Sequence, residues 1–160
     1  MAARIVQAEG SEAVELARRL FQEYAAALEV DLAFQGFAEE LEGLPGAYVP
    51  PGGGLLLGFD GHEPAGCAAF RPLEPAVAEM KRLYVRPAAR GGGWGRRLAT
   101  RVVTDARAAG YQRLRLDTLP SMGAALGLYL NLGFREIPAY RHNPVPGTRF
   151  LELDLHAAQG

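Results

Sequence analysis

The sequence has little of several residue types that would by themselves suggest a function. It contains one cysteine in 160 residues, Cys67, so no disulfide can form within the chain and no thiolate cage can hold a metal. Its three histidines, His62, His142 and His156, do not have the spacing of metal ligands. The formal net charge is −1, which gives no support for general affinity to nucleic acid. We therefore expect no metal site and no nucleic-acid partner.

Long apolar runs are absent as well. No stretch of 18 apolar residues occurs, and the first ten residues, MAARIVQAEG, contain no apolar segment of a signal peptide. We therefore expect no membrane association and a cytoplasmic location. A chain of this length corresponds to one domain, residues 1–160, and it is long enough to bury a hydrophobic core without disulfides.

The hydrophobic periodicity divides the chain into strands and helices. Strands are expected at 3–8, 55–59, 67–73, 76–85, 113–119, 134–137 and 149–155. Helices are expected to begin at Ser11, Asp31, Trp94 and Ser121. Residues 44–54 contain three prolines and four glycines and are expected to form a loop. The order β-α-α-β-β-β-α-β-α-β-β predicts an α/β fold, with a mixed sheet because helices join some strands and hairpins join others.

The segment VRPAARGGGWGRRLA, residues 85–99, combines glycines and arginines between a predicted strand and a predicted helix. The glycines are Gly91, Gly92, Gly93 and Gly95, and the arginines around them include Arg90, Arg96 and Arg97. The first amides of a helix have no partner within the helix, and their dipole favours an anion. Glycines let phosphate oxygens approach those amides closely. The segment predicts a pyrophosphate site, and a flexible loop is the alternative.

Three phosphate-binding motifs compete for this segment. A P-loop needs a lysine and then a serine or threonine after the glycines, and neither follows here. The Rossmann pattern G-x-G-x-x-G is met by Gly91 and Gly93, but Arg96 stands where the third glycine belongs. The pattern R-x-x-G-x-G is matched in full by Arg90, Gly93 and Gly95.

With these residues the chain resembles the GNAT superfamily of N-acetyltransferases. In that family a strand ending L-x-V precedes a loop with R/Q-x-x-G-x-G/A and then a helix. The strand signature is matched by Leu83 and Val85. A second family signature, A-x-x-L-Y-x-x-x-G-F, is matched by Ala125, Leu128, Tyr129, Gly133 and Phe134. The resemblance covers essentially the whole chain and is specific from Glu79 to Phe134.

The resemblance implies a GNAT fold: a mixed, mostly antiparallel sheet whose central parallel strand pair splays to admit acetyl-CoA, with about four helices. It implies acetyl-CoA as the cosubstrate, an amine as the acceptor and no metal, and it leaves a homodimer open. The residues expected to bind acetyl-CoA are Leu83, Val85, Arg90, Gly91, Gly92, Gly93, Trp94, Gly95 and Arg96. Plain core packing is the alternative for Leu83 and Val85. Many family members have an asparagine that contacts CoA where this chain has Met122.

Two residues are expected to move protons. The resemblance gives Tyr129 the role of the acid that protonates the thiolate of CoA, and an aromatic core residue is the compatible alternative. Glu79 lies eleven residues before Arg90, where some family members carry a catalytic glutamate. It would take a proton from the acceptor amine through water. A solvated charge, or a partner of Lys81 or Arg82, is the alternative for Glu79.

The acceptor is the least determined part of the prediction. The family often builds the acceptor pocket from the first two helices and the last hairpin, where this chain has Phe34, Phe37, Tyr140, Arg141, His142 and Asn143. Arg82 and Arg141 could bind an acceptor carboxylate, although ordinary surface arginines are the simpler interpretation. We predict an N-acetyltransferase for a small or amino-acid-like amine that reacts by direct attack in a ternary complex. The alternatives are a non-catalytic acyl-CoA sensor and a nucleotide-binding enzyme.

Overall fold

A single sheet of seven strands runs through the molecule. The computed structural model describes residues 3–28, 32, 36–120 and 122–156. The strands are β1 (Ala3–Gln7), β2 (Gly54–Asp60), β3 (Glu63–Glu74), β4 (Val77–Val85), β5 (Arg113–Thr118), β6 (Arg135–Ile137) and β7 (Arg149–Asp154). They lie in the order β1-β2-β3-β4-β5-β7-β6, in which β4 and β5 are parallel and the other neighbouring strands are antiparallel. The predicted mixed sheet is confirmed.

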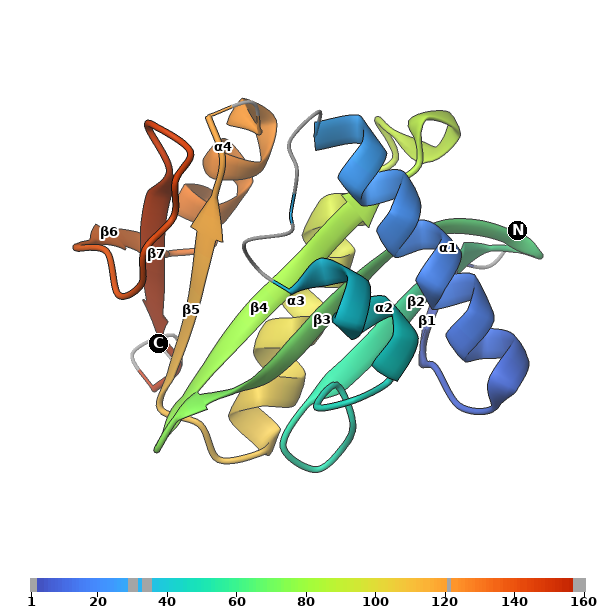
Figure 1. Ribbon diagram of the computed structural model, residues 1–160, viewed down its shortest axis with the longest axis horizontal. Coiled ribbons are helices and arrows are strands. Elements are labelled where there is room, and N and C mark those ends of the chain that lie inside the picture. The colour runs from blue at the N-terminus through green and yellow to red at the C-terminus, as the bar shows by residue number, and fades with distance from the viewer. Residues whose placement is uncertain (1–2, 29–31, 33–35, 121, 157–160) are drawn as a thin grey trace.

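Four α-helices cover the two faces of this sheet. They are α1 (Ser11–Leu28), α2 (Phe37–Gly43), α3 (Trp94–Ala108) and α4 (Gly123–Asn131), with a short 3-10 turn at Pro87–Ala89. Helices α1 and α2 lie on one face and α3 lies on the other, while α4 stands beside the end of β5 (Figure 1). The predicted order of helices and strands is confirmed. None of the helices in the described ranges combines the length and the apolar character that a membrane span requires.

The strand β3 and the helix α4 begin two or more residues away from their predicted starts. The strand expected at 67–73 begins at Glu63, because the hairpin from β2 needs only a two-residue turn with Gly61 at a φ of 64°. Helix α4 begins at Gly123, because Met122 is its N-cap and has the non-helical angles φ −106° and ψ 45°. Ser121, and the helix start expected at Asp31, lie outside the described residues.

The core has two layers, one on each face of the sheet. Alternate residues of a strand face opposite sides, so Leu55 and Leu57 pack with α1 while Leu56 packs with α3. Cys67 is fully buried in the α1 layer, as expected for a small apolar side chain. The sheet is therefore packed on both faces, and this packing positions the loops that follow its strands.

The parallel pair β4–β5 separates near its middle. The two strands pair only from Val77 to Glu79 on β4, against Arg113 to Arg115 on β5. Beyond this point Arg82 has a φ of 63°, and the register of β4 against β3 shifts nearby. The two strands then diverge, and a gap opens between their carboxyl ends. Ligands of α/β proteins bind at such an edge, beyond the carboxyl ends of parallel strands.

Candidate active site

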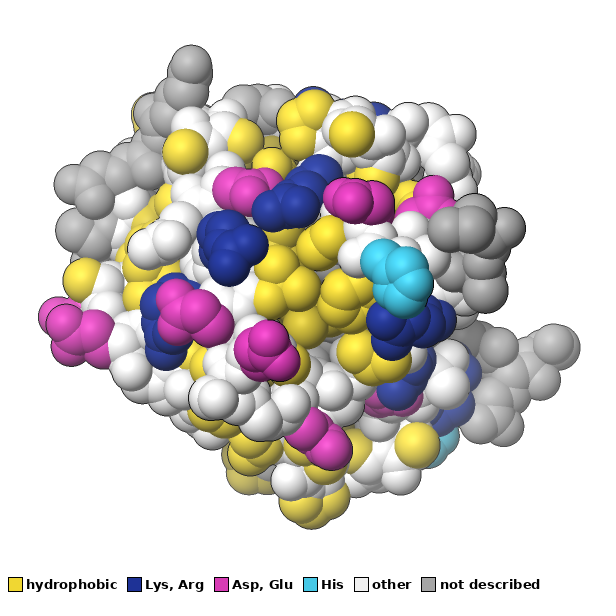
Figure 2. All heavy atoms as spheres, turned by 90° about the vertical axis from the view of Figure 1, so that its right-hand side faces the viewer, with side chains coloured by type: hydrophobic (Ala, Val, Ile, Leu, Met, Phe, Trp, Pro, Cys, Tyr) yellow, Lys and Arg dark blue, Asp and Glu magenta, His cyan; other side chains and the backbone are white. Residues whose placement is uncertain are grey.

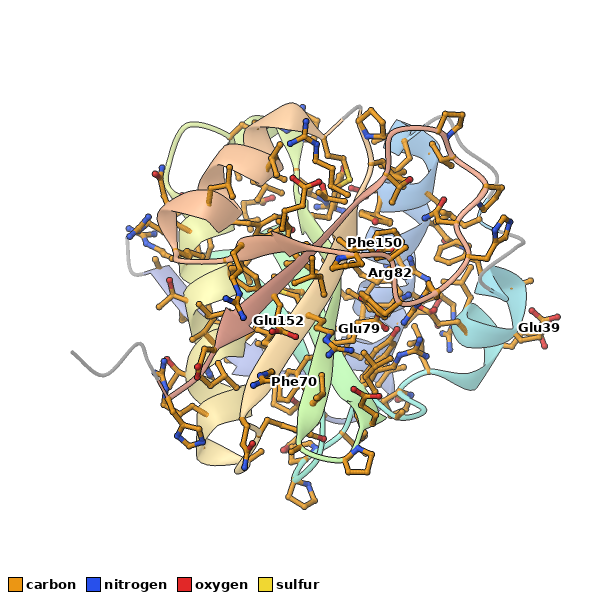
Figure 3. The ribbon with its side chains drawn as sticks, turned by 90° about the vertical axis from the view of Figure 1, so that its left-hand side faces the viewer. Glu39, Phe70, Glu79, Arg82, Phe150 and Glu152 are labelled. Atoms are coloured by element: carbon orange, nitrogen blue, oxygen red, sulfur yellow. The ribbon has the colours of Figure 1, made fainter. Side chains whose placement is uncertain are left out.

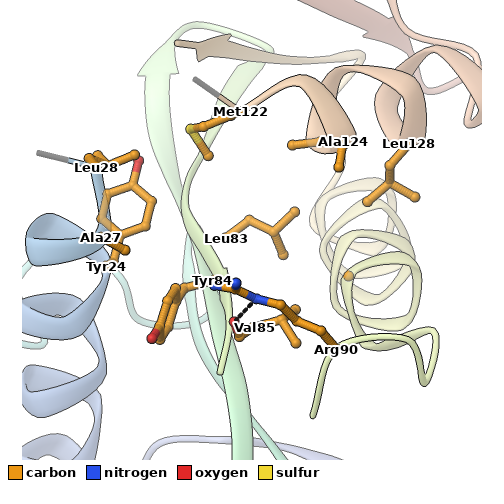
Figure 4. Close-up of a pocket in the computed structure, with 12 residues that line it drawn as sticks. Tyr24, Ala27, Leu28, Leu83, Tyr84, Val85, Arg90, Met122, Ala124 and Leu128 are labelled. Atoms are coloured by element: carbon orange, nitrogen blue, oxygen red, sulfur yellow. Dashed lines mark hydrogen bonds between the residues drawn. The ribbon is translucent and has the colours of Figure 1, made fainter. Parts of the chain in front are cut away.

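A channel of about 500 Å³ lies where the carboxyl ends of β4 and β5 diverge (Figure 4). Its walls come from the end of α1, the end of β4, the start of α3 and the first turns of α4. The lining is mostly apolar and consists of Tyr24, Ala27, Leu28, Leu83, Tyr84, Val85, Arg90, Gly95, Met122, Ala124, Ala125 and Leu128. A long and largely apolar arm fits such a channel.

The start of α3 closes one end of the channel without a side-chain cap. Gly93 is the N-cap at a φ of 79°, which glycine adopts without strain, and it supplies no side-chain hydrogen bond to the first amides of the helix. A Cβ built on Gly95 would lie 3.4 Å from Leu128 Cδ2 and 3.9 Å from Val85 Cγ2. Arg90 Nε donates to the carbonyl oxygen of Val85 at 3.3 Å. These uncapped amides, with Arg90 beside them, suit an anionic group at the mouth of the channel.

The predicted cofactor residues divide between two hollows. Leu83, Val85, Arg90 and Gly95 line the channel. Gly92, Gly93, Trp94 and Arg96 line a second and more open groove, between the start of α3 and β1. Gly91 lines neither hollow, although it adjoins both groups along the chain. Of the predicted set, the structure therefore brings four residues together at the channel.

A smaller hollow continues the channel into the gap. It is lined by Tyr24, Met80, Lys81, Arg82, Leu83, Leu116, Asp117, Met122 and Tyr129. Tyr24, Leu83 and Met122 line both hollows, so the two adjoin each other at these side chains. Its volume of about 20 Å³ is close to the space that one water molecule needs. It can hold the head of a small polar group but not its body.

Tyr129 lies at this inner hollow, as its motif predicts for the sheet opening. The side chain is 4% exposed, and its ring packs against Phe134 at 5.7 Å between centroids. Burial, with smaller contributions from Tyr24 and Asp117, raises the pKa of the Tyr129 phenol. The hydroxyl therefore stays protonated at neutral pH and can act as a donor.

Two charged residues of the inner hollow were not among the predicted site residues. Asp117 stands near the end of β5, where its Oδ2 accepts from Asn143 Nδ2 at 3.4 Å. Lys81 is 8% exposed, and burial, followed by the charge of Arg82, lowers the pKa of its ammonium to about 8. The signal that could have identified Asp117 is its place near the end of a strand parallel to β4, shortly before the Tyr129 helix.

Glu79 lines neither the channel nor the inner hollow. Its carboxylate is fully buried and accepts from Tyr140 Oη at 2.8 Å and from Arg71 Nη2 at 3.2 Å. It also forms an ion pair with Arg141. Burial raises the pKa of this carboxyl, but Lys81 and Arg141 outweigh that effect and hold it below the usual range. Figure 3 shows Glu79 and Arg82 on the same side of the sheet.

The two arginines considered for an acceptor carboxylate already have carboxylate partners in the protein. Arg82 is 3% exposed, and its Nη2 and Nε donate to the carboxylate of Glu40 at 2.7 and 2.9 Å. The expectation of an ordinary surface arginine is therefore wrong for this residue. The guanidinium also lies 5.1 Å from the ring centre of Phe37. Arg141 forms its ion pair with the carboxylate of Glu79. Phe34, the other predicted acceptor residue on the second helix, lies outside the described residues.

The sequence and the fold match known acetyltransferases. Residues 11–134 match the model of the acetyltransferase (GNAT) family. An uncharacterised N-acetyltransferase of Schizosaccharomyces pombe is 38% identical over 140 residues, which cover 86% of each protein. An IAA acetyltransferase of Azospirillum brasilense is 39% identical over 92 residues, which cover 56% of this chain and 60% of that protein.

Solved structures share the fold. A GNAT acetyltransferase of Staphylococcus aureus superposes with a TM-score of 0.79 at 21% identity, over 96% of this chain and 99% of the other. A Salmonella typhimurium acetyltransferase solved with acetyl-CoA has a TM-score of 0.65 at 22% identity, over 97% of this chain and 95% of the other.

Proposed function

This chain belongs to the GNAT family of acetyltransferases, and we propose that it transfers the acetyl group of acetyl-CoA to the primary amine of a small acceptor. The observation that carries the proposal is that two hollows adjoin each other at the gap between β4 and β5. One suits a long apolar arm with an anion at its mouth, and the other suits an amine head beside Tyr129. The proposal includes direct attack in a ternary complex, and the two adjoining hollows support it, since they would hold acetyl-CoA and the amine side by side.

The residues of β4 and α3 would hold acetyl-CoA. The pantetheine arm lies along Leu83 and Val85, where β4 has lost its pairing with β5. Its pyrophosphate meets the uncapped amides at the start of α3, with Arg90 adding a positive charge. Met122 lines the channel where many relatives have asparagine, and it supplies apolar contact to the arm.

The inner hollow supplies a site for the acceptor amine. The carboxylate of Asp117 attracts an ammonium group to it. An amine in water has a pKa of about 10.4 and must lose a proton before it can attack. Burial and the charge of Arg82 lower the pKa of the Lys81 ammonium in this hollow to about 8. The same two effects would favour loss of a proton from an acceptor amine bound there, while Asp117 would oppose it.

Tyr129 completes the reaction as the acid. When the amine nitrogen attacks the thioester carbon, the carbon–sulfur bond breaks and the thiolate needs a proton. The Tyr129 hydroxyl is kept protonated by burial, and it lies in the hollow where the amine binds. Burial also raises the proton affinity of the thiolate, which offsets the raised pKa of the phenol. The amine proton leaves to Asp117 or to solvent, and the phenolate of Tyr129 takes up a proton from solvent before the next turnover.

Glu79 has a supporting role in this scheme. Its carboxylate already accepts from Tyr140, Arg141 and Arg71, so its lone pairs are engaged and its lowered pKa makes it a weak base. The contacts fix the segment between β6 and β7 to the middle of the sheet. We assign Glu79 to this anchoring rather than to proton transfer.

The direct test of the proposed function is a screen for CoA release. The protein is incubated with acetyl-CoA and a panel of primary amines, amino acids and short peptides, and free thiol is measured. A small primary amine should give turnover above the rate without acceptor. If acetyl-CoA binds but no member of the panel gives turnover, the proposed acceptor class is wrong.

The variant Gly95→Val should lose most of its affinity for acetyl-CoA. Its side chain would enter the channel between Leu128 and Val85, while helical angles at Gly95 spare the fold the strain that a side chain at Gly93 would cause. Calorimetry should show affinity at least about tenfold weaker, which corresponds to about 1.4 kcal/mol. Gly127→Val is the matched control, because Gly127 lies in α4 with nothing within 4 Å of its added Cβ. Equal affinity in both variants would place acetyl-CoA elsewhere.

The variant Glu79→Gln should mainly lose stability. Removing the charge leaves Arg141 and Arg71 without their buried carboxylate, and the free energy of unfolding should fall by about 3 kcal/mol at neutral pH. The pKa of Glu79 is lower in the folded protein, so this contribution is present above the ordinary pKa of 4.5 and is lost as pH falls below it. Denaturant titrations at several pH values measure it. A stable variant whose kcat falls and recovers at high pH would instead support the general-base role.

A further inference from the structure

The chain contains a single lysine, Lys81, among its 17 basic side chains, and the others are arginines. An arginine guanidinium stays protonated in proteins, so it has no lone pair with which to attack a thioester. Because Lys81 is only 8% exposed, the basic side chains on the face that Figure 2 shows belong to arginine. The one side-chain amine of this sequence therefore lies inside the protein.

A β-bulge in β4 brings Lys81 to the inner hollow. The pairing of β4 with β3 shifts between Lys81 and Tyr84, so that β4 has one residue more than β3 over this stretch. The irregular backbone includes Arg82, whose φ is 63°. Lys81 and Arg82 both line the hollow, although strict alternation along a strand would direct adjacent side chains to opposite faces.

Lys81 also extends the line along which acetyl-CoA is proposed to lie. Arg90 stands at the mouth of the channel, and Val85 and Leu83 line it further in. Lys81 lines the inner hollow two residues beyond Leu83 on the same strand, a separation of about 7 Å. The thioester end of the arm has to pass Leu83 to reach Tyr129, and it would therefore approach the Lys81 amine.

The surroundings of Lys81 favour the neutral amine, which is the form that attacks. Burial and the charge of Arg82 lower the pKa of its ammonium to about 8. Arg71 acts in the same direction, while Glu79 and Asp117 oppose it. About a tenth of such a group is neutral at pH 7, against less than about a thousandth of a lysine with the ordinary pKa of about 10.4.

We propose that Lys81 is itself an acetyl acceptor, so that the protein acetylates its own single lysine when no other amine occupies the inner hollow. The lone pair of Lys81 Nζ forms a bond to the acetyl carbon, and the carbon–sulfur bond breaks. The thiolate of CoA takes a proton from Tyr129, and Nζ loses one proton to Asp117 or to solvent. The Tyr129 phenolate is then protonated again from solvent.

The groups that this step needs are in the hollow already. Its two tyrosines, Tyr24 and Tyr129, stay protonated because burial raises the pKa of both phenols. The inference rests on the proposed function in one respect, since acetyl-CoA has to lie in the channel. It goes beyond that function because the acceptor is a residue of the protein.

Acetylation of Lys81 closes the acceptor site. The product is an amide, which does not pass its acetyl group on to an amine. The inner hollow has a volume of only about 20 Å³, so the added acetyl group takes the place of an acceptor amine. Turnover with an external amine should therefore fall as Lys81 becomes modified, and a bound acceptor should slow the modification.

Mass spectrometry of the whole protein can follow the modification. The protein is incubated without acceptor in acetyl-CoA whose acetyl group carries deuterium, so that new groups differ from any acquired during expression. We expect a labelled acetyl group on the protein, and peptide mapping should place it on Lys81. Excess CoA, which occupies the channel, should stop the labelling. Labelling of Lys81 that CoA does not affect would overturn the proposal.

The variant Arg19→Lys supplies a matched control within the same molecule. It adds an exposed lysine on α1, outside the channel and the inner hollow. Because a bound thioester is held close to the amine, Lys81 should be labelled at least about 100-fold faster than the introduced lysine. Similar rates at the two lysines would mean that acetyl-CoA modifies them without binding, and the proposal would fail.

The amine screen on the same preparation separates this inference from the proposed function. Turnover with an external amine while Lys81 stays unlabelled would reject only the acetylation of Lys81. The absence of both turnover and labelling would reject the two together. Labelling of Lys81 without turnover on any amine of the panel would support the inference and reject the proposed acceptor class.

Discussion

Tyr129→Phe is expected to lower kcat by about 10²–10³-fold while the affinity for acetyl-CoA stays nearly unchanged, because the phenol acts only as the carbon–sulfur bond breaks. The substitution removes one oxygen atom and keeps the ring. Packing against Phe134 therefore survives, and the fold should be preserved. CoA release at saturating acceptor gives kcat, and calorimetry gives the affinity for acetyl-CoA.

Two other tyrosines make this experiment specific. Tyr111→Phe is the control, since its hydroxyl donates to the carbonyl oxygen of Gly52 at 2.6 Å, outside both hollows. It should keep kcat within about twofold of the parent protein. Tyr24 is the competitor, because it lines both hollows. A large loss in Tyr24→Phe together with a normal Tyr129→Phe would move the acid role to Tyr24.

Asp117→Asn is expected to lower kcat/KM for the acceptor amine by about 10²–10³-fold, because an ammonium group loses its half-buried carboxylate partner. The amide is nearly the same size, so the inner hollow should keep its shape and the affinity for acetyl-CoA should not change. The loss should appear mainly in KM if Asp117 only binds the amine, and also in kcat if it takes the proton. Initial rates over a range of acceptor concentrations separate the two.

The matched control for this variant is Asp60→Asn. Asp60 is an exposed residue at the end of β2 and lines neither the channel nor the inner hollow. Its kcat/KM should remain within about twofold of the parent value. An Asp117→Asn enzyme with normal kcat/KM for every amine that the parent accepts would exclude Asp117 from the acceptor site.

Much of the fold follows from the sequence because its signals are local. The alternation in RLRLDTL and the apolar stripe of Leu98, Val102 and Ala106 each depend on residues close together in the chain, and both elements form where predicted. The glycine loop and the Tyr129 motif are local as well, so the family could be predicted, and a channel lies beside the loop where the sequence predicts acetyl-CoA to bind. The starts of β3 and α4 differ from the prediction, because a two-residue turn decides the first and a single N-cap residue decides the second.

Only the tertiary structure decided which charges meet. Glu79 is engaged by Tyr140, 61 residues away, and Arg82 by Glu40, 42 residues away. No local pattern encodes such pairs, because they depend on how the segment between β6 and β7 and helix α2 fold back over the sheet. The same applies to Asp117 and Lys81, which share a hollow only because β4 and β5 separate after three paired positions. The sequence by itself determined that a glycine loop joins a strand to a helix, because these signals are local. The divergence of two strands determined which side chains line the hollows beside that loop.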